Sequence, residues 1–186
     1  PASDEWGAGE EVVIEGYSGN AMEPKILANG EYLFFNNKTG DDSEMDVHYA
    51  QRVDDTHFTY RGILTGVDGY LDGVPAVDVN LNFYFISMRG FADDGITIYS
   101  GRFEGSSVTG VAVAGAGVAD TEPGHLTMDV DVTIDGLFLV ASRAVFSGGT
   151  LPDSADLDLA AQGADGFEFI SGAANGLFGE VNTEEF

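Results

Sequence analysis

The fold of this chain is decided by the stretch VPAVDVNLNFYFISMR, residues 74–89, and by two counterparts of it. The counterparts are EPKILANGEYLFFNN, residues 23–37, and DVDVTIDGLFLVASR, residues 129–143, so the copies recur at intervals of about fifty residues. Each copy reads as a short strand, a turn at Asn29, Asn80 or Asp135, and a strongly apolar strand. Repeats of about 40–50 residues with four strands each are typical of β-propeller blades.

The repeat predicts strands throughout and almost no helix. The second strands, 32–36, 83–87 and 138–142, are apolar on both faces, which indicates that each lies between two neighbouring sheets. Third strands are expected near 46–49, 97–99 and 156–159, and outer strands near 58–64, 108–113 and 167–170. The fold class is therefore all-β, a β-propeller with about three four-stranded blades.

The predicted organisation is one domain with an open ring. Residues 17–66, 67–118 and 119–174 are the three blades, residues 1–16 hold a closing strand, and residues 175–186 begin a further blade. A strand at 11–15 is expected to pair with the last blade, as closing strands do in propellers. Three blades cannot close a ring, so the remaining blades come either from further sequence or from another copy of the chain.

Several of these residues carry a resemblance to a known repeat. Glu-Pro followed by Gly, Leu and Phe, with a later Ser-x-Arg and Ile-Tyr, resembles the TolB-type, WD-like β-propeller repeat. The matching residues are Glu23-Pro24 with Gly30, Leu33 and Phe35, then Ser87-Met88-Arg89 with Ile98-Tyr99, and Asp135-Gly136 with Ser142-Arg143.

The resemblance covers about residues 17–172, and the run from Asn20 to Thr183 is also similar to secreted bacterial five-bladed propellers. It implies an exported interaction module in the extracellular space or periplasm. The sequence departs from the repeat in two places: Asn36-Asn37-Lys38 stands where Ser-x-Arg is expected, and Leu81 replaces the turn glycine.

The charge limits the partners of this chain. Its 186 residues include 7 Lys and Arg against 32 Asp and Glu, a net charge of −25. Nucleic acid and anionic membranes both require basic surfaces, so neither is an expected partner. No apolar run is long enough to insert into a membrane, and the chain has no Cys, which excludes disulfides and thiol chemistry.

Chemistry in a propeller is expected where the first strands line the central channel. The polar residues on these strands are Glu23, Lys25, Asp78, Asp129 and Asp131. Paired carboxylates there would suit glycoside hydrolysis, so Glu23, Asp78 and Asp131 are the candidate catalytic residues. Lys25 lies on one of the same channel-lining strands, so it is a candidate ligand-binding residue.

The remaining candidates lie in connections and at strand ends. His125 precedes a channel-lining strand, and Arg89 and Arg143 end equivalent second strands, so these three are candidate ligand-binding residues. No cofactor is required. Ca²⁺ is the metal that acidic loops would hold, and the candidate ligands are Asp41, Asp42, Glu44, Asp93 and Asp94.

Three functions are consistent with these features. The first is an exported, non-catalytic recognition scaffold for a glycan or a protein ligand. The second is a glycoside hydrolase or lyase that uses the channel carboxylates. The third is a structural protein whose copies form a homo-oligomer by pairing through open sheet edges.

Overall fold

The structure is a computed structural model that describes residues 8–40, 42–66, 69–149 and 151–170. Thirteen strands are found in this part of the chain. They are β1 (Val13–Glu15), β2 (Asn20–Ile26), β3 (Tyr32–Lys38), β4 (Val47–Arg52), β5 (His57–Thr65), β6 (Asp72–Val77), β7 (Asn82–Gly90), β8 (Ile96–Phe103), β9 (Val108–Val113), β10 (His125–Val132), β11 (Phe138–Val145), β12 (Ser154–Gly163) and β13 (Gly166–Phe169). Two short helices, η1 (Asp42–Glu44) and α1 (Phe91–Asp94), follow β3 and β7.

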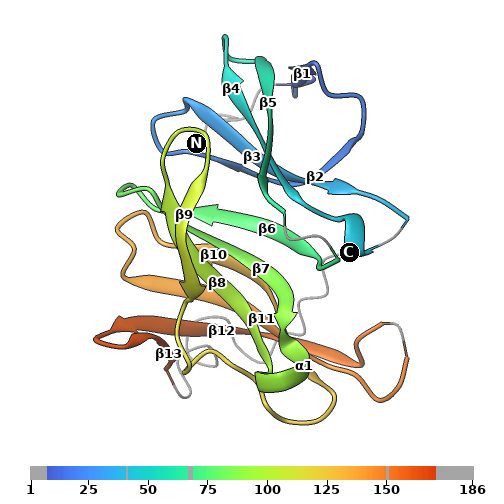
Figure 1. Cartoon of the computed structure of the whole chain (residues 1–186), viewed down its shortest axis with the longest axis vertical. Coiled ribbons are helices and arrows are strands. Elements are labelled where there is room, and N and C mark those ends of the chain that lie inside the picture. Colours follow the sequence, from blue (N-terminus) through green and yellow to red (C-terminus); the bar gives the residue numbers. More distant parts are fainter. Residues whose placement is uncertain (1–7, 41, 67–68, 150, 171–186) are drawn as a thin grey trace, which may run out of the picture.

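The strands form three sheets that follow one another in chain order (Figure 1). The second sheet has the order β6-β7-β8-β9 and the third the order β10-β11-β12-β13. The first sheet, β1-β5-β4-β3-β2, has the same four antiparallel strands and one more. We call the sheets blades 1, 2 and 3. In the part of the chain that is described, no helix is long and apolar enough to cross a membrane.

The extra strand corrects one expectation. Strand β1 was predicted to pair with the last blade, whereas it lies parallel to β5, the outer strand of blade 1, with Val13 opposite His57. The chain then crosses the outward face of this blade, where Tyr17 packs on Phe35 with ring centroids 4.9 Å apart. This crossing covers apolar surface of blade 1 that no neighbouring blade covers among the described residues, including Phe35, which is fully buried.

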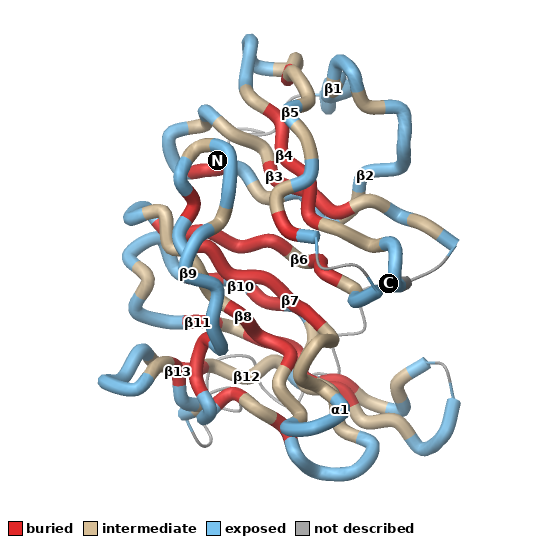
Figure 2. The backbone as a smooth tube through the Cα atoms, viewed as in Figure 1, coloured by how far each residue is buried: buried red, intermediate tan, exposed pale blue. Residues whose placement is uncertain are grey.

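Blades 1 and 2 are joined by aromatic packing. The ring of Phe34 from β3 meets Phe83 of β7 at 5.1 Å and Phe103 of β8 at 4.9 Å, both in edge-to-face geometry. Such pairs are favourable beyond the area that they bury. All three rings are buried. Figure 2 shows buried stretches of the backbone along β3, β7 and β8, the strands that carry them.

Blades 2 and 3 share a second core. Tyr84 and Ile86 of β7 point to the face opposite Phe83, and they pack with Leu139 of β11 and Phe167 of β13. Successive residues of β7 are therefore buried on both faces, as a strand between two sheets requires. The apolar second strand predicted for this repeat is confirmed.

Each first strand contains a β-bulge at the same place. The pairing register shifts between Met22 and Lys25 in β2, and at equivalent positions in β6 and β10. The residues in the bulges have positive φ: Glu23 (51°), Val74 (51°) and Asp129 (48°). A bulge bends its strand and re-aims a side chain, so the blades turn their inner edges in the same way.

The turn after each first strand also has a residue in the left-handed region. Gly30 and Gly136 supply it in blades 1 and 3, with φ of 74° and 75°, while Leu81 adopts φ of 68° in blade 2. The departure noted at Leu81 thus changes the residue and leaves the turn geometry intact. Leu81 packs against the core shared by blades 1 and 2, which offsets part of the strain of that conformation.

Truncation of Phe34 tests the interface between blades 1 and 2. Phe34→Ala should lower the free energy of unfolding by about 3–5 kcal/mol, because it leaves a cavity among buried rings. The measurement is urea denaturation, monitored by far-UV circular dichroism. Val53→Ala is the control, since Val53 is 63% exposed, and it should change stability by less than about 0.5 kcal/mol. Equal effects of the two substitutions would contradict this packing.

Candidate functional site

The first strands bring polar residues of different blades together. Strand β6 contacts both β2 and β10, and all three are edge strands of their sheets. The ammonium of Lys25 on β2 forms an ion pair with the carboxylate of Asp131 on β10, which joins blade 1 directly to blade 3. We call Glu23, Lys25, Asp129 and Asp131 the inner-edge cluster.

The bulges hold two carboxylates of this cluster. Glu23 and Asp129 occupy equivalent bulge positions in blades 1 and 3, and each keeps a positive φ that most residues avoid. Buried Asn36 supports the arrangement, because its Oδ1 accepts a hydrogen bond of 3.1 Å from the backbone N–H of Val74 in the bulge between them.

The charged forms of both carboxylates are disfavoured. Desolvation raises the pKa of Glu23, and the nearby charge of Asp129 raises it further, against the opposing hydrogen bonds from Asn36 and the Val74 N–H. Desolvation also raises the pKa of Asp129. Glu23 and Asp129 are both exposed residues, so a ligand in solution can reach the two carboxylates.

Asp78 does not belong to this cluster. It was predicted to line the channel, but β6 ends at Val77 and Asp78 begins the following turn. Its Oδ1 accepts hydrogen bonds from the backbone N–H groups of Asn80 (2.8 Å) and Asn82 (2.9 Å), and its Oδ2 accepts one from Asn82 Nδ2 at 2.7 Å. The buried carboxylate therefore holds the β6–β7 turn closed.

A second group of candidates meets between blades 2 and 3. The connection from β7 to β8 and the connection from β9 to β10 enclose a pocket of about 230 Å³. Asp93, Asp94 and His125, which the sequence suggested separately, line it together with Asp120 and Glu122. We call it the loop pocket.

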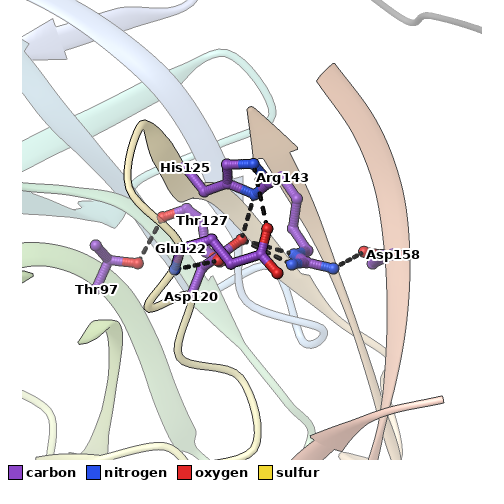
Figure 3. Close-up of polar contacts among 7 residues, drawn as sticks. All are labelled: Thr97, Asp120, Glu122, His125, Thr127, Arg143 and Asp158. Carbon is purple, nitrogen blue, oxygen red and sulfur yellow. Dashed lines mark hydrogen bonds and ion pairs between the residues drawn. The ribbon is translucent and has the colours of Figure 1, made fainter. Parts of the chain in front are cut away.

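His125 lies between two carboxylates in this pocket (Figure 3). Its Nδ1 is 3.4 Å from Asp120 Oδ2, and its Nε2 is 3.6 Å from Glu122 Oε2. Asp120 is buried, and burial alone would raise its pKa. Hydrogen bonds from Arg143 and the Glu122 N–H, with the charges of Arg143 and His125, outweigh burial and hold the pKa of Asp120 below its usual range.

Arg143 connects this pocket to the third blade. Its Nε and Nη2 donate hydrogen bonds to Asp120 Oδ2 at 3.0 and 2.7 Å, and its Nη1 donates to Asp158 Oδ2 at 3.0 Å. The guanidinium also stacks over the ring of Phe169, 5.2 Å from its centroid. Arg143 thus ties the blade 2–blade 3 connection to β12.

Arg89, the equivalent residue of blade 2, is likewise held by hydrogen bonds within the protein. Its Nη2 donates to both oxygens of fully buried Asp72, at 2.9 and 2.7 Å, and its Nε donates to Ser87 Oγ at 2.8 Å. The guanidinium lies over the rings of Phe85 and Tyr99. Every contact that the structure shows for Arg89 and Arg143 is within the protein and stabilises the fold. A ligand-binding role for these two residues stays a prediction.

The candidate metal ligands are spread over several places. Among the described residues, no group of three or more His, Asp or Glu side chains is arranged to hold a metal ion. Asp93 and Asp94 lie on exposed α1, and Glu44 lies in η1, where its carbonyl accepts a hydrogen bond from Asn37. Asp41 and the side chain of Asp42 fall outside the described residues. A Ca²⁺ site stays a prediction.

No pattern in the sequence pointed to Asp120 or Asp158 as site residues. Both lie outside the repeated stretches, in a connection and in a third strand, and only the fold brings them to Arg143. The repetition of Arg89 and Arg143 by blade did indicate a structural role, such as a bond to loop carbonyls or to an acid of the neighbouring blade.

Comparison with known proteins gives the fold. TolB from Agrobacterium tumefaciens aligns with a TM-score of 0.55 and 13% identity, over 83% of this chain and 50% of that one. A prolyl endopeptidase, from a study of inter-domain dynamics in catalysis and specificity, aligns with a TM-score of 0.51 and 16% identity, over 83% of this chain and 22% of that one. No protein-family model and no curated protein matches the sequence.

These likenesses concern the fold alone, because the identities are low. The chain spans half the length of the TolB structure and less than a quarter of the endopeptidase. With the three sheets described above, they confirm a β-propeller fold, and the described residues form three blades of an incomplete ring.

Replacement of Asp120 tests the link between blades 2 and 3. Asp120→Asn should lower the free energy of unfolding by about 2 kcal/mol, because Arg143 keeps only Asp158 as a charged partner. The deficit should shrink below about pH 4, since an acid with a depressed pKa stabilises the fold above its unfolded pKa and loses that effect as it protonates. Urea titrations between about pH 3 and 7 measure both.

Asp158→Asn is the matched control for Asp120→Asn. It removes one charge from the same arginine, but the Asp158 side chain is 27% exposed against 2% for Asp120. Its effect should be clearly smaller. A larger effect of Asp158→Asn would show that Asp120 is not the main partner.

Neutral amides at the two bulges should stabilise the protein. Because the pKa values of Glu23 and Asp129 are raised, the folded state loses stability as pH rises through them. The double variant Glu23→Gln, Asp129→Asn should therefore melt about 2 °C above the wild type near pH 7, with no difference below about pH 4. Asp131→Asn, which breaks the pair with Lys25, should not raise the melting temperature. A gain that is constant with pH would contradict this origin.

Proposed function

We propose that this chain is a propeller recognition scaffold whose inner-edge cluster binds a cationic segment of a protein partner. The observation that carries this proposal is the pair of carboxylates, Glu23 and Asp129, at equivalent bulges of blades 1 and 3. They repel each other and face solvent. A Lys or Arg side chain placed between them would remove the repulsion, and an Arg could bind both through its fork of N–H groups.

The charge balance of the chain supports a cationic partner. Of its 7 Lys and Arg, Lys25, Arg52, Arg89 and Arg143 already form ion pairs with Asp residues. The 32 acidic residues far exceed what these can neutralise. A field of this sign attracts basic ligands and speeds their association.

Recognition accounts for the cluster better than hydrolysis does. Two of the three candidate catalytic residues have other bonds: Asp78 holds its turn, and Asp131 pairs with Lys25. Glycoside hydrolysis needs one acid and one nucleophile or base free to reach the sugar. An exported location and a catalytic role for Glu23 stay predictions from the sequence.

Binding of a basic peptide tests the proposal. The probe is the octapeptide (Gly-Arg)₄, titrated calorimetrically into the full chain, with (Gly-Gln)₄ as the neutral reference. The basic peptide should bind and the neutral one should not, and affinity should fall at least tenfold between about 50 and 500 mM salt. Glu23→Gln, Asp129→Asn should weaken binding about tenfold or more.

A second double variant separates the cluster from the general acidity. Glu10→Gln, Glu104→Gln removes two exposed carboxylates outside the cluster, so the net charge is the same as in the first double variant. It should bind the basic peptide nearly as well as the wild type. An equal loss in the two double variants would mean that binding follows net charge alone, and the proposal would be wrong.

A further inference from the structure

A further cavity lies away from both acidic clusters. It is a groove of about 680 Å³ between blades 2 and 3, at the end of the fold where the β6–β7 turn meets the β10–β11 turn. The hairpin between β8 and β9 and the hairpin between β12 and β13 form its walls. Its volume falls in the range of pockets that hold small organic ligands. Of the candidate site residues proposed from the sequence, only Asp78 lines this groove, and it was proposed as a residue of the central channel.

Tyr84, a buried tyrosine, lines the groove. Tyr84 is only 5% exposed, and its ring packs at right angles on Phe167 with centroids 5.7 Å apart. Its hydroxyl has no hydrogen-bond partner among the described residues. A tyrosine hydroxyl in such a position usually finds a partner, so the groove offers a place for one. Burial and the charge of Asp78 raise the pKa of Tyr84 to about 12, which keeps this hydroxyl protonated.

Two of the three carboxylates that line the groove, Asp78 and Asp135, are already satisfied by hydrogen bonds. Asp78 accepts three hydrogen bonds within its own turn. Asp135 accepts bonds from Thr133 Oγ1 at 2.6 Å and from the Leu137 N–H at 3.1 Å. These donors already compensate the negative charges, so the groove holds no bare pair of acids like that of the inner edge.

The remaining lining is rich in neutral hydrogen-bonding groups. It includes the side chains of Asn80, Ser100, Thr109 and Gln162. Ser100 lies directly opposite Tyr84 on the neighbouring strand, so the two side chains share a face. Amide and hydroxyl groups around one buried phenol match a ligand that carries many hydroxyls and no charge.

We propose that the groove between blades 2 and 3 binds a short neutral oligosaccharide, with the Tyr84 hydroxyl bonded to a sugar hydroxyl. An anionic ligand would meet Asp78, Asp135 and Asp165 against the single charge of Arg102. Arg102 in turn donates from Nη1 to the carbonyl of Asn80 at 3.0 Å. A hydrocarbon ligand would leave the polar lining without partners. This site is separate from the inner-edge cluster and does not depend on its function.

Three neutral trisaccharides test the proposal: maltotriose, cellotriose and triacetylchitotriose. Each is titrated into the full chain and followed by two-dimensional NMR, with trigalacturonate as the anionic comparison. At least one neutral sugar should bind with a Kd of about 1 mM or tighter, and trigalacturonate should bind none of the groove residues. The absence of binding by all three below about 10 mM would overturn the proposal.

Two variants locate the binding. Tyr84→Phe removes one hydroxyl and keeps the buried ring, and it should weaken the sugar about three- to tenfold. Ser100→Trp fills the groove and should abolish binding. Tyr49→Phe is the matched control, because Tyr49 is 7% exposed in the core between blades 1 and 2, and it should bind as the wild type does. Unchanged binding in both groove variants would place the sugar elsewhere and overturn the proposal.

Discussion

The inner strands of blades 1 and 2 are apolar on both faces, and the need to cover both faces is the constraint on which the rest of the structure depends. Strand β7 has five consecutive buried residues, Phe83–Ser87. Its odd positions face blade 1 and its even positions face blade 3. A sheet of this kind cannot face water on either side, so the blades must stack face to face in chain order. The stacking then sets where the first strands meet and where grooves open between blades.

The same constraint explains the N-terminal crossing. Blade 1 has blade 2 on one face, and Phe35, Ala50 and Phe58 lie on the other. The segment from β1 to β2 covers that face with Ile14 and Tyr17. Pairing of β1 with β5 holds the crossing in place at the outer edge. The strand that the sequence assigned to ring closure thus shields a blade of its own chain.

Sequence reasoning succeeded where a pattern repeats and failed where a single residue leaves it. The apolar second strands and the turns recur three times, so their positions could be predicted within a few residues. Asp78 has the sequence position of a strand residue, but β6 ends at Val77, and the Asp78 carboxylate accepts the hydrogen bonds of the turn that follows. An alternation pattern does not mark the residue at which a strand gives way to a turn.

The sites show the same division. Lys25 and Asp131 could be placed on one channel because first strands share an axis, and the structure pairs them. His125 could be placed near a channel-lining strand, but its neighbour Asp120 could not, since a connection between blades has no periodicity to read. The groove over Tyr84 could not be predicted from the sequence for a related reason. The sequence shows that Tyr84 is buried, and only the packing of two blades shows that its hydroxyl has been left an opening.

The chemistry of the two ends follows from how each carboxylate is satisfied, and not from how many there are. At the inner edge, Glu23 and Asp129 sit in bulges, where desolvation raises the pKa of both and the charge of Asp129 raises that of Glu23 further. At the groove, Asp78 sits in a turn whose N–H groups converge on it. A chain with a net charge of −25 therefore holds poorly compensated carboxylates at one edge and carboxylates that are hydrogen-bonded within their own turns at the groove. The local backbone geometry decides to which of these two groups a given acid belongs.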